Sequence, residues 1–215
     1  EASKITSLGM EETMEFIKPG IREYEIAAEV EYSIRKNGAD GIAFETIVAS
    51  GERTCLPHGG CTERRIQRGD IVVIDLGAKY RGYCIDITRT MVVGTPTQRQ
   101  REIFESVKLA QEQAMKVLRE GVEAQKPDEE ARETLKMKGL GEYFVHGLGH
   151  GLGLEIHEPP TLRPGNTEIL KKGNIVTVEP GVYIPGFGGI RIEDTVHILE
   201  DGFEKLTNFP IDITV

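Results

Sequence analysis

The 215-residue sequence lacks the features that mark several classes of protein. Its apolar runs stay well below the roughly 18 continuous residues that a membrane-spanning helix needs. Its first residues, EASKITSLGMEE, have neither the basic nor the apolar stretch of a signal peptide. A formal net charge of -9 disfavours nucleic acid and anionic membranes as partners. The three cysteines form no Cys-x-x-Cys pair, which fits a reducing compartment. We therefore expect a cytoplasmic protein without a membrane or nucleic-acid partner.

The motifs of several enzyme classes are missing as well. The sequence contains no G-x-S-x-G elbow and no cysteine and histidine arranged with a supporting acid, which disfavours serine and cysteine hydrolases. It contains neither a Walker A string nor a G-x-G-x-x-G string placed after a strand, which disfavours a nucleotide-binding role. A chain of this length can bury roughly 70% of its unfolded surface without a structural metal. Any bound metal is therefore free to be catalytic.

Helical and strand-like segments follow one another along the chain. Apolar spacing and Gly or Pro breaks predict helices over residues 1–18, 22–36 and 97–121, and between Pro127 and Gly139. Thr97 and Gln100 have the S/T-x-x-E/Q spacing of a capping box at the start of the third helix. Segments rich in β-branched residues and bounded by Gly predict strands over 71–76, 84–93, 175–179 and 190–199.

The two halves of the chain carry a weak internal repeat. RGDIV at 68–72 runs into DLG at 75–77, and KGNIV at 172–176 runs into EPG at 179–181. Downstream, IDIT at 85–88 has its counterpart in IEDT at 192–195. Each half also supplies two helices around these strands. The repeat predicts two similar αβ units, each offering two carboxylates from the strands of a hairpin.

Acidic residues recur in register within this repeat. A carboxylate inside an apolar strand is costly to bury unless it is paired or binds a metal. Taken singly, Asp75 and Glu179 can be explained as turn residues, and Glu193 as a partner of Arg191. Their recurrence favours a metal site. We predict its ligands to be the four carboxylates and the imidazole of the glycine-rich string at 147–153: Asp75, Asp86, His150, Glu179 and Glu193.

The chemistry of these side chains narrows the choice of metal. Carboxylates with a single imidazole suit Mn²⁺, Co²⁺, Fe²⁺ or Zn²⁺. Five such ligands exceed what one ion needs, whereas two ions about 3.5 to 4 Å apart account for all of them. A zinc knuckle built from Cys55, His58 and Cys61, with Cys84 as fourth ligand, is the alternative site. It is disfavoured because a chain of this size needs no structural metal.

Five strings of this sequence resemble those of the "pita-bread" metallopeptidases, which comprise methionine aminopeptidase, aminopeptidase P and prolidase. They are IDLGA at 74–78, DITRT at 86–90, GLGHGLGLEIHEPP at 147–160, VEPGVY at 178–183 and GGIRIEDT at 188–195. A further string, IVASGERTCLPHG at 47–59, is most similar to prolidase and its Xaa-Pro peptidase relatives. The resemblance covers essentially the whole chain.

The resemblance implies an α+β fold of the pita-bread type. This fold is a pseudo-twofold pair of αβ units whose curved, mostly antiparallel sheet is covered by helices. Residues 1–215 would form one catalytic domain, without the N-terminal domain that prolidase-like enzymes carry. In such enzymes the additional domain helps to form a dimer, so we expect a homodimer of the longer protein.

The resemblance also implies a role for each site residue. Asp86 and Glu193 would bridge the two ions, Asp75 would complete one ion, and His150 with Glu179 would complete the other. A water held between the ions would attack the scissile carbonyl. The catalytic residues that it implies beside the substrate are His58, His157 and Glu179, with Glu179 moving a proton, and the substrate-binding residues are His58, His157 and Arg191.

The implied substrate is a small peptide cleaved next to proline, as by an Xaa-Pro dipeptidase. Thr161 stands where prolidases carry an arginine for the free carboxylate of a dipeptide, and Arg163 follows two residues later. Aminopeptidase P or methionine aminopeptidase activity on longer peptides therefore stays open. A non-catalytic peptide-binding module of the same fold is the alternative from another class. We expect His146 and His197 to be structural.

Overall fold

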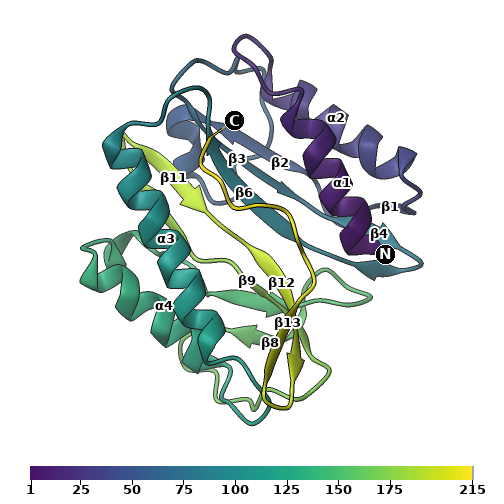
Figure 1. The fold of residues 1–215 in the computed structure, drawn as a ribbon, viewed down its shortest axis with the longest axis vertical. Coiled ribbons are helices and arrows are strands. Elements are labelled where there is room, and N and C mark those ends of the chain that lie inside the picture. Colours follow the sequence, from purple (N-terminus) through teal and green to yellow (C-terminus); the bar gives the residue numbers. More distant parts are fainter. Residues whose placement is uncertain (215) are drawn as a thin grey trace.

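A computed structural model describes residues 1–214 of the protein. The first half begins with two helices and continues through six short strands and one 3₁₀ turn. These elements are α1 (Ala2–Met14), α2 (Glu23–Lys36), β1 (Gly41–Ile42), β2 (Ile47–Ser50), η1 (Gly51–Cys55), β3 (Ile71–Leu76), β4 (Ala78–Tyr80), β5 (Tyr83–Cys84) and β6 (Ile87–Val92). Helices α1 and α2 lie together over these strands (Figure 1).

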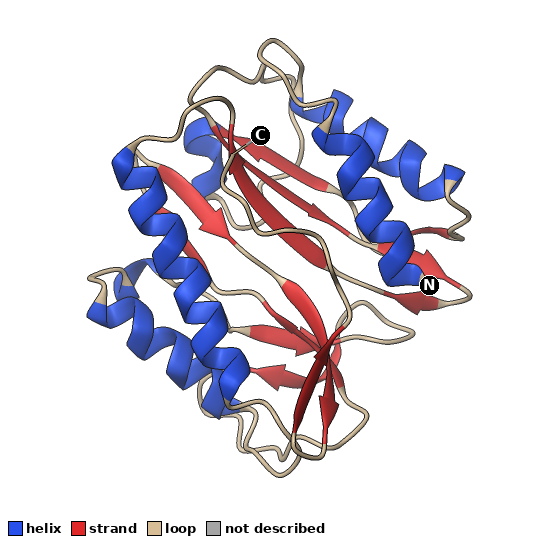
Figure 2. Cartoon of the chain, in the orientation of Figure 1, coloured by secondary structure: helices blue, strands red, loops and turns tan. Residues whose placement is uncertain are grey.

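The second half repeats this plan with two helices followed by strands. Its elements are α3 (Gln98–Lys116), α4 (Gln125–Met137), η2 (Gly141–Tyr143), β7 (Gly149–Gly151), β8 (Glu158–Leu162), β9 (Ile175–Val178), β10 (Gly181–Ile184), β11 (Gly188–Arg191), β12 (Asp194–Leu199) and β13 (Gly202–Lys205). Figure 2 shows the helices on the outside of the molecule and the strands of both halves between them. Within residues 1–214 no helix is long and apolar enough to cross a membrane.

The named strands pair only in antiparallel fashion within the described part of the chain. In the first half β3 lies between β2 and β6, and in the second half β9 lies between β12 and β7. The halves join where β6 meets β11 and β12, and the Thr90 hydroxyl there donates to the Arg191 carbonyl at 2.7 Å. Helices segregated on antiparallel sheets make an α+β fold, as the sequence predicts.

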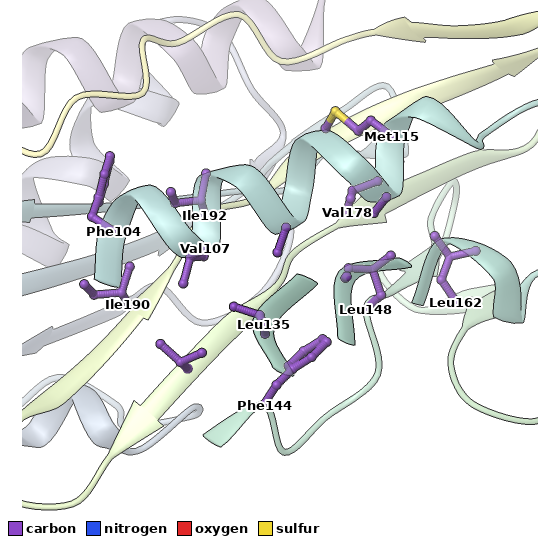
Figure 3. Close-up of a cluster of buried hydrophobic side chains, with 14 of the residues drawn as sticks. Phe104, Val107, Met115, Leu135, Phe144, Leu148, Leu162, Val178, Ile190 and Ile192 are labelled. Atoms are coloured by element: carbon purple, nitrogen blue, oxygen red, sulfur yellow. The ribbon is translucent and has the colours of Figure 1, made fainter. Parts of the chain in front are cut away.

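Each half has its own hydrophobic core between its helices and its sheet. In the second half, α3 places Phe104, Val107 and Met115 against Val178, Ile190 and other strand residues (Figure 3). The buried positions of α3 follow the helical period, because residues three or four apart share one face. The two cores hold each sheet against its own pair of helices.

The predicted helices form, with shifted ends. Thr97 caps α3, and the predicted capping box with Gln100 is confirmed. Helix α3 ends at Lys116 rather than at residue 121, because the backbone that follows bonds to the segment before β9: the Gly121 N–H donates to the Leu170 carbonyl at 2.9 Å. The first helix ends at Met14 rather than at residue 18. The fourth begins at Gln125, since Pro127 is tolerated in a first turn.

The predicted strands 84–93 and 190–199 are each divided in two. The first is interrupted between β5 and β6, at Ile85 and Asp86, and the second between β11 and β12, at Ile192 and Glu193. The backbone there leaves one sheet to pair with another element. The Ile85 N–H, for example, donates to the Ala78 carbonyl at 3.1 Å. Both interruptions fall at a carboxylate that the sequence analysis predicts to bind metal.

Strand β7 is absent from the sequence prediction because it is rich in glycine. Gly149 and Gly151 pass so close to neighbouring strands that an added Cβ would lie 2.1 Å from the Thr177 carbonyl oxygen and 2.5 Å from that of Glu158. Glycine is unfavourable in most strands, but it is needed where two backbones approach this closely. The close packing places His150 between β8 and β9.

Candidate metal centre

A cavity of about 320 Å³ opens between the two halves of the molecule. All eight residues that the sequence analysis assigns to the site line it. From the first half come His58, Asp75 and Asp86, and from the second His150, His157, Glu179, Arg191 and Glu193. The sheets thus bring together side chains that are up to 135 positions apart, from 58 to 193.

Three of these side chains converge most closely. Asp86, His150 and Glu193 each offer one donor atom, and the three atoms lie within 4.8 Å of one another. The Nε2 atom of His150 lies 3.7 Å from Asp86 Oδ2 and 3.5 Å from Glu179 Oε1. These distances exceed a normal hydrogen bond, and they leave space for a cation between the donors.

Several carboxylate oxygens of the cavity are left without a partner. Asp75 Oδ1, Asp86 Oδ1 and Glu193 Oε1 are buried and accept no hydrogen bond from residues 1–214. A buried oxygen without a partner costs free energy, and an anionic one costs more. Mostly oxygen donors with one imidazole are the ligand set of Mn²⁺, Co²⁺, Fe²⁺ and Zn²⁺. The donors of the cavity therefore fit divalent metal.

The pKa values of these groups reflect the same crowding. Burial and the neighbouring carboxylates raise the pKa of Asp86 and of Glu193 well above their ordinary values. Burial likewise raises the pKa of Glu179 to about 7. Without a cation, burial and mutual repulsion disfavour ionisation of all of these carboxyl groups near neutral pH. A bound dication would reverse this effect.

His150 is oriented as a metal ligand requires. Its Nδ1 lies 3.0 Å from the Gly151 carbonyl, and because a carbonyl only accepts, Nδ1 carries the proton. The lone pair is left on Nε2, which faces the carboxylates. Burial lowers the pKa of His150 to about 4, so the imidazole is neutral. The ring of His157 packs edge-on against it, with centroids 4.3 Å apart.

Arg191 lies in the wall of the cavity with its side chain almost fully buried. Its Nη2 donates to Asp75 Oδ2 at 2.6 Å, so it pairs with Asp75 and not, as the sequence alternative has it, with Glu193. Its Nη1 donates to the Pro57 carbonyl at 3.0 Å and to the Tyr183 hydroxyl at 2.9 Å. Arg191 thus connects a candidate ligand to the loop that carries His58.

Comparison with known proteins identifies the family. A sequence model of metallopeptidase family M24 matches residues 1–200. The chain belongs to this family. The Xaa-Pro dipeptidase of Pyrococcus furiosus is 51% identical over 207 residues, which are 96% of this chain and 60% of the relative. The resemblance found in the sequence motifs is confirmed.

Solved structures of relatives share the fold of this M24 chain. The prolidase from Pyrococcus furiosus superposes with a TM-score of 0.95 at 51% identity, covering 97% of this chain and 62% of that one. The X-Pro aminopeptidase from Thermotoga maritima superposes with a TM-score of 0.97 at 46% identity, covering 100% of this chain and 61% of that one. The predicted pita-bread fold is confirmed. The M24 chain spans about three fifths of the length of these relatives.

The alternative zinc knuckle does not assemble in the M24 chain. The Cys61 thiol donates to the Thr46 carbonyl at 3.2 Å, and the Cys84 thiol donates to the Leu154 carbonyl at 3.8 Å. Within residues 1–214, the group of donors close enough for an ion contains no cysteine. Pro57 and His58 of this loop line the cavity instead.

Sequence reasoning missed several residues that shape the site. His146, expected to be structural, lines the cavity, and its Nε2 accepts from the Tyr183 hydroxyl at 2.9 Å. Thr88 donates to Glu193 Oε2 at 2.5 Å, and Thr177 donates to Glu179 Oε1 at 3.1 Å. Thr88 lies in the repeated string at 85–88, whereas Thr177 carries no such signal, since its counterpart in the first half is Val73. The His146 contact carries no sequence signal, because Tyr183 is 37 residues away.

His58 and His157 lie in the wall of the cavity with exposed side chains, free to contact a bound molecule. Thr161 and Arg163 also line it, and Thr161 lies opposite His150 in the β7–β8 pair. His197 lies elsewhere, on β12, with Nδ1 3.6 Å from Glu204 Oε2. The cavity wall therefore offers imidazole and guanidinium groups as well as the acidic cluster.

Proposed function

We propose that this chain is the catalytic domain of a dinuclear metal-dependent peptidase that hydrolyses the peptide bond next to proline. The observation that carries the proposal is the set of buried carboxylate oxygens, from both halves, that face one cavity without a partner. The relatives named Xaa-Pro dipeptidase and prolidase support the choice of substrate. The chain spans only 60% of the length of the Pyrococcus furiosus relative, so its own activity and substrate require the direct test below.

The proposed ligands are those of the sequence analysis. Asp86 and Glu193 would be shared by two ions, Asp75 would complete one, and His150 with Glu179 the other. Bound divalent ions would supply a low-pKa water as nucleophile and an electrophile for the scissile carbonyl. We propose Mn²⁺, Co²⁺, Fe²⁺ or Zn²⁺, since all four accept this ligand set.

The chain's own residues would orient the peptide and move protons. His58 and His157, exposed in the cavity wall, would donate to the substrate carbonyl oxygen or to the leaving amine and stabilise the tetrahedral intermediate. Glu179, whose pKa is raised to about 7 by burial, would accept and return a proton at its carboxylate. Arg191 would contact the substrate from the wall while it holds Asp75 in place.

Metal analysis combined with peptide cleavage tests this proposal. The protein is stripped with a chelator, reloaded with Mn²⁺ or Co²⁺, and assayed on an Xaa-Pro dipeptide, an Xaa-Pro tripeptide and a Met-Ala peptide. We expect two ions per chain and cleavage of the dipeptide. Glu204→Gln, which changes an exposed carboxylate on β13, is the control and should keep both properties. A reloaded protein with neither bound ions nor turnover would leave the binding module as the function.

The same assay separates the remaining candidates. Preference for the tripeptide would indicate an aminopeptidase, an activity favoured by Thr161 in the cavity wall and by the likeness to the X-Pro aminopeptidase. Preference for the Met-Ala peptide would indicate methionine aminopeptidase activity. We propose a cytoplasmic enzyme, supported by the free thiols of Cys55, Cys61 and Cys84. The homodimer of the longer protein stays a prediction.

A further inference from the structure

Two carboxylates from different halves of the chain meet along one junction. Asp86 precedes β6 in the first half, and Glu193 lies between β11 and β12 in the second. The Glu193 N–H donates to the Thr88 carbonyl at 3.1 Å, and the Thr195 hydroxyl donates to the Asp86 carbonyl at 2.8 Å. The separation of the two carboxylates is therefore decided by how the halves join.

The guanidinium of Arg89 lies at this junction with all of its N–H groups used. Nη1 donates to the carbonyls of Thr88 and Glu193 at 2.9 and 2.6 Å. Nη2 donates to Asp194 Oδ1 at 2.8 Å. The remaining donors reach two carbonyls of the C-terminal segment, those of Phe209 and Pro210. A guanidinium has five donors in a fixed plane, and here each has an acceptor.

Arg89 therefore ties together three separate segments. They are β6, the link between β11 and β12, and the C-terminal segment, which Figure 1 shows crossing between the two halves. Arg89 is only 2% exposed, so these bonds are shielded from water. A lysine would offer three donors on one atom and could not reach the same set of acceptors.

Asp194, the partner of Arg89, is completely buried and fully bonded. Its Oδ1 also accepts from the Thr207 hydroxyl at 2.8 Å, and its Oδ2 accepts from Gln111 Nε2 at 3.2 Å and forms an ion pair with Lys205 Nζ at 2.8 Å. Successive side chains of an extended chain point to opposite faces. Glu193 faces the cavity, whereas Asp194 faces helix α3 and the C-terminal segment. The ion pair thus lies behind the candidate metal site.

We propose that the Arg89–Asp194 ion pair is a positioning device that holds the carboxylates of Asp86 and Glu193 at the spacing that two divalent ions share. The inference rests on the two-ion site of the proposed function. Like charges repel across a buried junction, and no covalent link near the site opposes their separation. The Arg89–Asp194 pair binds both segments on the side away from the cavity. It therefore opposes their separation without contacting the ions or the substrate.

Metal binding by the Arg89→Lys protein tests this inference. The metal-free protein is titrated with Mn²⁺ in a calorimeter, and electron paramagnetic resonance of the loaded protein reports magnetic coupling between neighbouring ions. We expect the second ion to bind roughly 10- to 100-fold more weakly, the range typical for residues that support metal ligands. We also expect the spectrum of coupled ions to weaken. Asp194→Asn, which keeps the shape of the side chain, should act in the same direction.

Arg64→Lys is the matched control. Arg64 likewise forms an ion pair with an aspartate, here through two contacts with Asp70 at 2.6 and 3.1 Å, but both residues lie within the first half. We expect this variant to unfold at a lower temperature and to bind both ions as the wild type does.

Three outcomes separate the claims. Folded Arg89→Lys and Asp194→Asn proteins that bind both ions with wild-type affinity and coupling would overturn the positioning role and leave the proposed function intact. Arg64→Lys weakening the second ion equally would also overturn it, since the effect would then follow general stability. A wild-type protein that binds fewer than two ions would overturn the proposed site itself.

Discussion

At the scale of single residues, the cavity concentrates carboxyl groups that are largely buried. Asp86 is 5% exposed and Glu193 is 1% exposed, and each has an oxygen without a hydrogen-bond donor. Stability alone would favour removing such groups, because an unpaired buried charge opposes folding. Their presence is explained by a cation that the folded chain binds. Replacing such a carboxylate is therefore expected to stabilise the metal-free protein and to destabilise the metal-bound protein.

Glu193→Gln should separate these effects. The amide keeps the acceptor for Thr88 but removes the charge. We expect the metal-free variant to be more stable than the wild type by roughly 1–3 kcal/mol, the cost of an unsatisfied buried polar group. We also expect it to lose stabilisation by Mn²⁺ and nearly all peptidase activity. Chemical unfolding with and without metal measures the two stabilities, and the cleavage assay measures activity. A metal-free variant less stable than the wild type would contradict the prediction.

The stability of the metal-free protein should depend on pH in a defined direction. The pKa of Glu179 is raised by burial from 4.5 to about 7, so the folded state keeps a proton that the unfolded state releases. Stability is therefore lost as the pH rises, by roughly 1.4 kcal/mol per pH unit for one proton. The pKa values of His146 and His150, lowered by burial to about 4, act oppositely, and their contribution fades as the pH rises above 6.5, the pKa of a histidine in the unfolded chain.

Comparing urea unfolding of the wild type and Glu179→Gln in chelator between pH 6.5 and 7 isolates the Glu179 contribution, because the two proteins share the same histidines. We expect the free energy of unfolding to fall with pH in this window, and to fall less steeply in Glu179→Gln. A rise with pH in the wild type, or equal slopes in the two proteins, would show that Glu179 does not carry the effect.

At the scale of elements, the site depends on strands that approach unusually closely. Strand β7 carries His150 between Gly149 and Gly151, and it pairs with both β8 and β9. The Thr177 hydroxyl, from β9, accepts the His150 N–H at 3.0 Å and donates to Glu179. The contact between the paired strands β7 and β9 thus orients two candidate ligands. Packing between these strands is therefore expected to control metal binding.

Gly149→Ala should disturb the packing of β7 against β9. The new Cβ would lie 2.1 Å from the Thr177 carbonyl oxygen, which belongs to the backbone and cannot turn away. We expect a loss of roughly 1–3 kcal/mol in stability, as for other overpacked sites, together with weaker Mn²⁺ binding. Gly60→Ala is the control, since nothing lies within 4 Å of its added Cβ. Thermal unfolding and metal titration measure the two effects. Unchanged metal affinity in Gly149→Ala would argue that β7 does not position His150.

At the scale of the whole molecule, the candidate ligands connect two halves that have separate cores. Asp75 and Asp86 belong to the first half, and His150, Glu179 and Glu193 belong to the second. A cation bound by all of them would cross-link the halves. Metal binding should therefore stabilise the fold as a unit, because only the folded state brings the ligands together.

Removal of metal should lower the unfolding temperature reversibly. A ligand present at 100 times its Kd stabilises the folded state by about 2.7 kcal/mol if it binds only that state. We expect a chelator to remove this stabilisation and added Mn²⁺ or Co²⁺ to restore it, as measured by calorimetry. Glu204→Gln should respond like the wild type, whereas identical unfolding temperatures with chelator and with metal would count against a site that joins the halves.

Local patterns in the sequence already predict much of this protein. The helix start at Thr97 follows from backbone capping, and the strand Ile71–Leu76 follows from its run of β-branched residues. Both signals depend on neighbours in the chain. The repeat and the motifs single out eight residues, and the fold brings all of them to one cavity. These residues stand out in the sequence because a carboxylate is costly to bury in an apolar strand and glycine is unfavourable in most strands.

Other features were decided only by the tertiary structure. The glycine-rich β7 forms because two neighbouring backbones leave no room for a Cβ, a fact that no local propensity contains. Arg191 binds Asp75 across 116 positions, and Arg89 reaches Asp194 across 105. Hydrogen bonds of this kind depend on how the halves dock. Residue types and spacing therefore predict which groups belong to the site, whereas the junction between the two halves determines how far apart they lie.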